Sequence, residues 1–166
     1  MFKIFSFMIF IIVTMLVVGC GSEKKPTVKS SMFQSVSPQE ATLLKSGKDK
    51  GSCGRCGMNL VMFYKTSHSA MHDGKHNQYC SIHCLEDHLS EGVTLENQQV
   101  VDLDSLKFIA VSEAHYVVGS KKRGTMTRVS KYAFSNKEMA QKFQAKYGGK
   151  VMDFNGALSK AKEDFR

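Results

Sequence analysis

Four cysteines, crowded into one short stretch, constrain this chain more than any other feature. Cys53 and Cys56 are separated by two residues, 23 residues follow, and Cys80 and Cys84 close the stretch. Five of the six histidines lie within it or just beyond it: His68, His72, His76, His83 and His88. Thiolates and thioethers are soft donors, which select Cu(I) or Zn(II) over hard cations. The stretch therefore predicts a fold built around a metal ion.

The first 20 residues predict export and a lipid anchor. Lys3 precedes an almost wholly apolar run from residue 4 to residue 18, which is short for a membrane span. Val17-Val18-Gly19-Cys20 is similar to a bacterial lipobox. We interpret 1–19 as a signal peptide and Cys20 as the lipidated residue, which removes Cys20 from the ligand set. An uncleaved transmembrane anchor is the alternative.

Residues 20–36 are polar and without periodicity, which predicts a flexible tether. The folded part is then exported, periplasmic or at the cell surface, and attached to a bacterial membrane. The net charge of +8 comes from basic residues that are scattered apart from Lys121-Lys122-Arg123. No nucleic-acid motif is visible, so we expect no nucleic-acid partner. The basic residues favour a solvated surface, with anionic lipid or an acidic partner as alternatives.

The pattern of elements predicts an α+β fold in two similar halves, 37–105 and 106–166. In the first half we expect a helix over 38–46, a strand over 59–66, a turn over 67–77, a strand over 78–80, a helix over 81–89 and a strand over 98–103. In the second half we expect strands over 115–119 and 131–134, a helix opened by a capping box at Ser135, and a strand over 150–154. Each half therefore reads strand, strand, helix, strand.

The spacing of the sulfur atoms favours one shared site. Glycines allow a tight turn between Cys53 and Cys56, while Cys80 and Cys84 flank a helix start, where free amides favour thiolates. His88 lies four residues after Cys84, on the same helix face. The two cysteine pairs are similar to a zinc knuckle, although the gaps depart from the usual spacing. Disulfides in any of three connectivities are the alternative.

Met58 favours copper over zinc. Cys56-Gly57-Met58 offers a thiolate and a thioether within three residues, and zinc has little use for a thioether. Ordinary core packing of Met58 is the competing interpretation.

The chain resembles the NosL family, lipoprotein copper chaperones of nitrous oxide reductase. The resemblance rests on the lipobox, the Cys53-to-Met58 motif, and the segments 114–120, 124–126 and 147–151. It implies two related α+β halves and a Cu(I) site with Cys56 and Met58. The third ligand would come from Cys53, Cys80, Cys84, a histidine such as His88, or Met126.

Two departures from the NosL pattern matter. Thr125 stands where family members usually carry proline before the methionine, here Met126. The Cys80 and Cys84 pair is instead similar to YHS and TRASH-type metal modules, which allows a structural zinc ion or a richer copper site.

Three hypotheses follow. The first is a membrane-anchored Cu(I) chaperone that delivers copper to an exported copper enzyme, nitrous oxide reductase, or to its assembly factors. The second is a scaffold in which four cysteines hold structural Zn(II). The third is a thiol–disulfide enzyme using Cys53 and Cys56, for which the sequence offers no thioredoxin-like context. No nucleophile with a paired base and no phosphate loop stands out, so we predict no enzyme.

Overall fold

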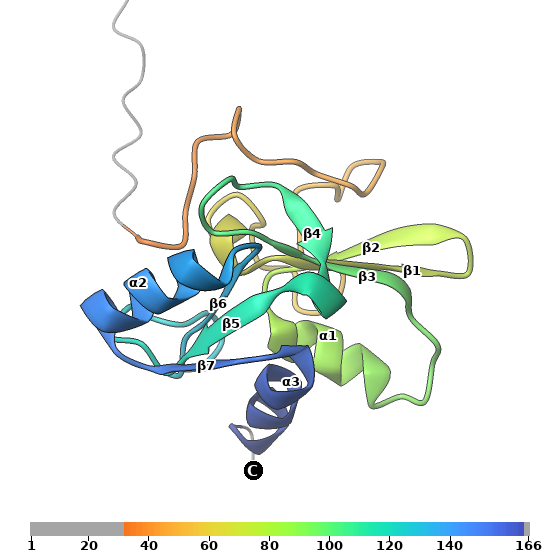
Figure 1. Ribbon diagram of the computed structural model, residues 1–166. Coiled ribbons are helices and arrows are strands. Elements are labelled where there is room, and N and C mark those ends of the chain that lie inside the picture. The colour runs from red at the N-terminus through yellow and green to blue at the C-terminus, as the bar shows by residue number, and fades with distance from the viewer. Residues whose placement is uncertain (1–31, 165–166) are drawn as a thin grey trace, which may run out of the picture.

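The computed structural model describes residues 32–164, which form two small antiparallel sheets and three helices (Figure 1). The predicted signal 1–19, Cys20 and the tether as far as residue 31 lie outside the described residues. Residues 32–36, expected to belong to the tether, instead pack on the domain, where Gln34 and Val36 are buried. Within 32–164, no helix has the length and apolar character needed to cross a bilayer.

The first sheet has the strand order β2-β1-β3-β4. It consists of β1 (His68–His72), β2 (Lys75–Tyr79), β3 (Glu96–Val101) and β4 (Phe108–Ala110). A 3₁₀ turn, η1 (Tyr64–Thr66), precedes β1, and helix α1 (Ile82–Leu89) connects β2 to β3. A second 3₁₀ turn, η2 (Val111–Glu113), leads into the second half.

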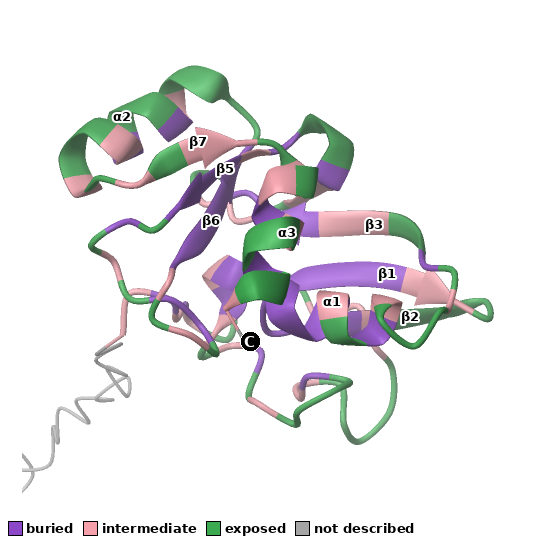
Figure 2. Ribbon diagram, turned by 90° about the horizontal axis from the view of Figure 1, so that it is seen from below, coloured by how far each residue is buried: buried purple, intermediate pink, exposed green. Residues whose placement is uncertain are grey.

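The second sheet has the order β6-β5-β7, formed by β5 (His115–Val118), β6 (Lys131–Phe134) and β7 (Lys150–Met152). Helix α2 (Lys137–Tyr147) covers this sheet, and helix α3 (Phe154–Glu163) lies beside α1 (Figures 1 and 2). The predicted α+β fold is confirmed, and each half contains the order strand, strand, helix, strand. The first strand of the first half is β1 rather than the predicted 59–66, and β4 and α3 are additions that the sequence did not indicate.

One apolar cluster joins the two halves. Ile82 and Val100 of the first half pack with Tyr116 and Val118 of the second, and the small Ala157 of α3 seals the cluster. Beside this cluster, the ring of the buried His68 forms a hydrogen bond with the Tyr116 hydroxyl at 3.1 Å, which adds a polar contact between the two halves. The core between the sheets therefore packs the first half, with its cysteines, against the second.

The expected helix over 38–46 does not form. Its capping box does form, since Glu40 accepts hydrogen bonds from the Ser37 amide at 2.9 Å and the Ser37 hydroxyl at 2.8 Å, but the chain makes only a turn. The Gln78 side chain then binds the Leu44 amide at 2.9 Å and the Thr42 carbonyl at 3.2 Å. Those backbone groups are taken by a tertiary contact, so they cannot continue a helix.

The expected strand over 59–66 is also wrong. The Asn59 side chain accepts hydrogen bonds from the amides of Val61 and Met62, which bends the segment into turns that end in η1. The residues predicted as a turn, 67–77, form most of the β1–β2 hairpin, and only Asp73 and Gly74 turn. These strands are polar, so their sequence lacks an apolar alternation.

Two boundaries in the second half also differ from prediction. Asn136, rather than Ser135, caps α2 by accepting from the amides of Glu138 and Met139. The last strand ends at Met152, because Asp153 accepts a hydrogen bond from the Gly156 amide and starts α3.

Candidate metal centre

The first cysteine pair sits in a tight backbone knuckle. Ser52 and Asn59 form an antiparallel bridge, and inside it the Cys53 amide donates to the Met58 carbonyl at 2.8 Å. Gly57 returns the chain with a positive φ of 76°, a conformation that glycine adopts without strain. The backbone of Cys56 and Arg55 also contributes to lowering the pKa of the Cys53 thiol. These backbone contacts therefore place Cys53 and Cys56 at the two sides of one tight turn.

The second pair comes from the junction of β2 and α1. Cys80 follows the last residue of β2, Ser81 is the N-terminal cap of α1, and Cys84 lies in the first turn of that helix. The Gly54 amide donates to the Gln78 carbonyl at 3.0 Å, which joins the knuckle to β2. The helix predicted over 81–89 is confirmed, and it supplies Cys84 as expected.

The four sulfur atoms converge. All lie within 4.8 Å of one another, with 3.5 Å between Cys56 and Cys80 and 3.8 Å between Cys80 and Cys84. Ligands about 2.3 Å from a tetrahedral ion lie about 3.8 Å apart, so this spacing suits one shared ion. All four thiols are free; Cys53, Cys80 and Cys84 are buried and Cys56 is exposed. The structure therefore contains none of the disulfides considered as an alternative for these four cysteines.

A thioether completes the cluster. The Met58 Sδ lies 3.9 Å from the Cys80 Sγ, while the rest of the side chain packs on the apolar cluster around Leu60 and Leu85. Both interpretations of Met58 therefore hold at once: the residue packs in the core and also presents sulfur to the thiols.

The thiols shift one another's protonation. The pKa of Cys53 is held well below its usual range, chiefly because the thiols of Cys80 and Cys84 donate to its sulfur. The contact with Cys53 and the burial of the group raise the pKa of Cys80. The contact with Cys53 also raises the pKa of Cys84. Hydrogen bonding from neighbouring thiols therefore favours the thiolate form of Cys53, and the thiolate is the form that binds a soft cation.

A surface hollow opens over the exposed edge of the cluster. Cys56 and Cys84 line it from the first half, and Met126 lines it from the loop between β5 and β6. Met126 is 42% exposed and has a positive φ of 72°. Its loop is tight, since a Cβ on Gly124 would lie 2.6 Å from the Thr127 carbonyl oxygen. The structure thus brings the predicted Met126 to the same opening as two of the cysteines.

Arg55 clamps the knuckle to α1. Its guanidinium forms a salt bridge with Asp87 at 2.8 Å and a second with Glu91. These carboxylates, Glu91 foremost, raise the pKa of Arg55. Asp87 and Glu86 also line the hollow. Sequence reasoning missed this clamp, although an arginine inside the cysteine motif and acidic residues on the following helix gave a signal.

His88 stands outside the sulfur cluster. Its Nδ1 forms a hydrogen bond with the buried Tyr79 hydroxyl at 2.8 Å, and its ring packs edge-on against His72. Among the residues from 32 to 164, the four cysteines form the group of potential ligands, and His88 does not belong to it. Cys84 and His88 lie on the same face of α1, as expected, but His88 is one helical turn further along the axis and does not join the sulfur cluster.

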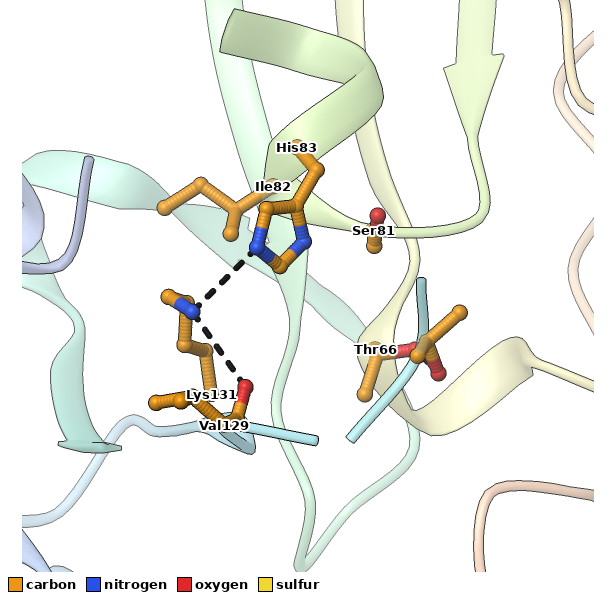
Figure 3. Close-up of a pocket in the computed structure, with 7 residues that line it drawn as sticks. Thr66, Ser81, Ile82, His83, Val129 and Lys131 are labelled. Carbon is orange, nitrogen blue, oxygen red and sulfur yellow. Dashed lines mark hydrogen bonds between the residues drawn. The ribbon is translucent and has the colours of Figure 1, made fainter. Parts of the chain in front are cut away.

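His83 belongs to a charged network at the join of the two halves. Its Nε2 lies 3.3 Å from the Lys131 Nζ, and Lys131 also donates to the Val129 carbonyl at 3.2 Å (Figure 3). The same Nε2 lies 3.2 Å from an Asp164 carboxylate oxygen. Ser81 and Thr66 line the same small cavity. Burial, followed by the nearby Lys131 charge, lowers the pKa of His83. His83 therefore ties α1 to β6 and α3.

These features define a small α+β protein with a cluster of cysteine sulfur atoms spaced closely enough to hold one metal ion. The chain belongs to the NosL family, whose model matches residues 45–160. The crystal structure of the copper chaperone NosL from Shewanella denitrificans is similar, with 26% identity and a TM-score of 0.54 over 71% of this chain and 95% of that one. No curated protein matches. Membership in this family confirms the predicted resemblance and the prediction that the chain is not an enzyme.

Proposed function

We propose that this protein is a membrane-anchored Cu(I) chaperone whose cargo is held by the sulfur cluster. The observation that carries the proposal is the Met58 thioether within 3.9 Å of Cys80, at the edge of a group of four thiols. A thioether adds little to a zinc site but is a good ligand for Cu(I). The donor set therefore fits monovalent copper better than any hard cation.

Access to the cluster supports a delivery role. Cys53, Cys80 and Cys84 are buried, whereas Cys56 is exposed at the hollow that Met126 also lines. A partner's soft ligands could therefore reach the ion at Cys56 while the buried thiols still hold it. Exchange of ligands one at a time avoids releasing a free ion, which is what a carrier requires.

Cys56 and Met58 are the proposed central ligands, and the Cys80 Sγ lies 3.5 Å from the Cys56 sulfur and 3.9 Å from the Met58 sulfur. Cys53 and Cys84 supply the remaining thiols, and Met126 lines the same hollow as Cys56 and Cys84. We assign no ligand role to His88, because it is engaged with Tyr79.

A competition titration with a Cu(I) chelator tests this site on the reduced protein. The double variant Cys56→Ser with Met58→Leu should lose at least about 30-fold in affinity, since each of the two lost soft ligands removes about 1 kcal/mol or more. Met62→Leu is the matched control, because Met62 is exposed and does not line the hollow. An unchanged affinity in the double variant rules the site out.

A structural Zn(II) site is the second candidate, favoured by the near-tetrahedral spacing of the four sulfur atoms. In that case the metal would hold the first half together, and its removal should unfold that half. Leu60 and Leu85 already give this half an apolar core. A circular dichroism spectrum that is unchanged after chelation would count against structural zinc and in favour of a carrier.

Anchoring at Cys20 and the client enzyme complete the proposal. The lipobox supports the anchor, and the family relation supports a copper enzyme as client, with nitrous oxide reductase or its assembly factors the first to examine. Cys20→Ala should move the protein from the membrane fraction to the soluble fraction. Retention in the membrane would refute lipidation at Cys20.

A further inference from the structure

Three lysines gather around two aromatic rings on one side of the domain. The Lys122 ammonium lies 4.6 Å from the centre of the Phe33 ring and 4.4 Å from that of Tyr147. Lys65 lies 5.1 Å from Phe33, and Lys146 lies 5.2 Å from Tyr147. We call Lys65, Lys122 and Lys146 with these two rings the basic patch. Cation–π contacts hold the three charges in place on an otherwise open surface.

The charges of the basic patch are not neutralised. Of the salt bridges among residues 32–164, none involves Lys65, Lys122 or Lys146. Glu40 is the acidic group that interacts with Lys65, and its carboxylate is already bound by Ser37. Lys121 and Arg123, both exposed, flank Lys122 in sequence and add to the positive potential.

The chain enters the folded domain at this patch. Phe33 is the second described residue, and its ring also packs edge-on against Tyr132, with centroids 5.2 Å apart. Eleven residues lie between Cys20 and Met32, which makes twelve steps from one Cα atom to the next. Whatever their conformation, they reach at most about 43 Å, so an anchor at Cys20 keeps the patch near the bilayer. Three lysines, Lys24, Lys25 and Lys29, lie in this segment beside one acidic residue.

We propose that the basic patch docks on anionic lipid headgroups of the membrane that carries the anchor, which orients the domain. This proposal rests on the proposed lipid anchor. Charge complementarity and the position of Phe33 both support a lipid partner, because a short tether gives the patch a high local concentration of headgroups. The loop that carries Lys122 also carries Met126, so the docked face is connected directly to the opening of the metal cluster.

A charge-matched pair of variants tests the patch without the native anchor. The chain from residue 21 keeps the whole described core, so it serves for partition into vesicles of phosphatidylglycerol and phosphatidylcholine. Lys65→Gln, Lys122→Gln and Lys146→Gln together should weaken binding about 100-fold, at about fivefold per lysine. Lys48→Gln, Lys75→Gln and Lys162→Gln remove equal charge from exposed sites that contact neither ring, and should weaken binding far less. Equal losses in both variants overturn the proposal.

Orientation is tested with the same chain held by an N-terminal histidine tag on nickel-lipid nanodiscs, so native lipidation is not required. Acylation of each lysine is followed by mass spectrometry on anionic and on neutral discs. The proposal predicts about fivefold or greater protection of the three patch lysines on anionic discs and none of Lys75 or Lys162. Labelling that is equal on both discs overturns it and leaves an acidic protein as the partner to seek. A failure of the proposed lipid anchor would be detected separately, by the fractionation of Cys20→Ala.

Discussion

Asp164→Asn should be among the most destabilising substitutions at the join of the two halves. One carboxylate oxygen of Asp164 accepts hydrogen bonds from Lys131, from His83 at 3.2 Å and from the Thr127 hydroxyl at 3.2 Å. The Lys131 side chain is 2% exposed and that of Asp164 is 12% exposed. Removing the carboxylate leaves a buried ammonium without its counter-charge.

The expected loss is about 3 kcal/mol, the lower end of the range for breaking a buried ion pair, because Asp164 keeps some contact with solvent. Urea denaturation of the apo protein measures this loss directly. Adding Lys131→Met to Asp164→Asn should restore most of it, since the stranded charge is removed while the stem is still buried. The reasoning fails if Asp164→Asn costs under about 1 kcal/mol, the level of an exposed pair, or if Lys131→Met brings no recovery.

The pH dependence of the stability of the same variant tests the direction of the pKa shift of Asp164. Burial acts to raise the pKa of Asp164, but the hydrogen bonds from Lys131, His83 and Thr127 outweigh it and lower the pKa. The contribution of this carboxylate is therefore complete above its unfolded pKa and is lost as pH falls through the lower folded value. The difference in stability between wild type and Asp164→Asn should shrink at acid pH and be constant near neutrality.

Three further predictions concern buried groups near the site. Tyr79→Phe should cost about 1–2 kcal/mol, because it leaves the buried His88 without its 2.8 Å partner, while Cu(I) affinity stays within about twofold; a large loss of affinity would place His88 among the ligands. Burial lowers the pKa of His68 to about 3, so stability should fall by up to about 1.4 kcal/mol per pH unit below the unfolded pKa of about 6.5, and His68→Gln should remove this slope in urea titrations. Gly124→Ala should cost about 2 kcal/mol or more, since its Cβ would lie 2.6 Å from a backbone oxygen, whereas Gly51→Ala, with open space around it, should be near neutral; equal thermal shifts would contradict the geometry.

The sequence was sufficient to predict the elements whose signals are local. The cap at Ser81 and the apolar face of Ile82, Leu85 and Leu89 predicted α1, and the spacing of the cysteines predicted one shared cluster. The apolar strands β5 and β6 were equally clear. These features depend on neighbours in sequence, so no knowledge of the tertiary fold was needed.

Other features depend on contacts between distant residues. The 38–46 segment carried a sound capping box, but Gln78 took its backbone groups. The aromatic run before η1 had strand propensity, yet the Asn59 side chain bent it. Strands β1 and β2 are polar and held by the pairing between them, and α3 buries only the small Ala157 and Ala161. None of these outcomes follows from periodicity alone.

The same distinction holds for the site. Cys53, Cys56, Cys80, Cys84 and Met58 were identified from spacing, and the structure brings all five sulfur atoms together. The approach of Met126 was suggested by the family resemblance alone, because it depends on how the two halves pack. The engagement of His88 with Tyr79 and the clamp by Arg55 required the structure.

X-ray absorption at the copper edge tests the central claim most directly. The measurement is made on the reduced protein loaded with one equivalent of Cu(I), beside Met58→Leu and the control Met62→Leu. The proposal predicts a first shell of sulfur alone, altered by Met58→Leu and unchanged by Met62→Leu. A shell that contains histidine nitrogen, or one that is identical in all three proteins, would contradict it.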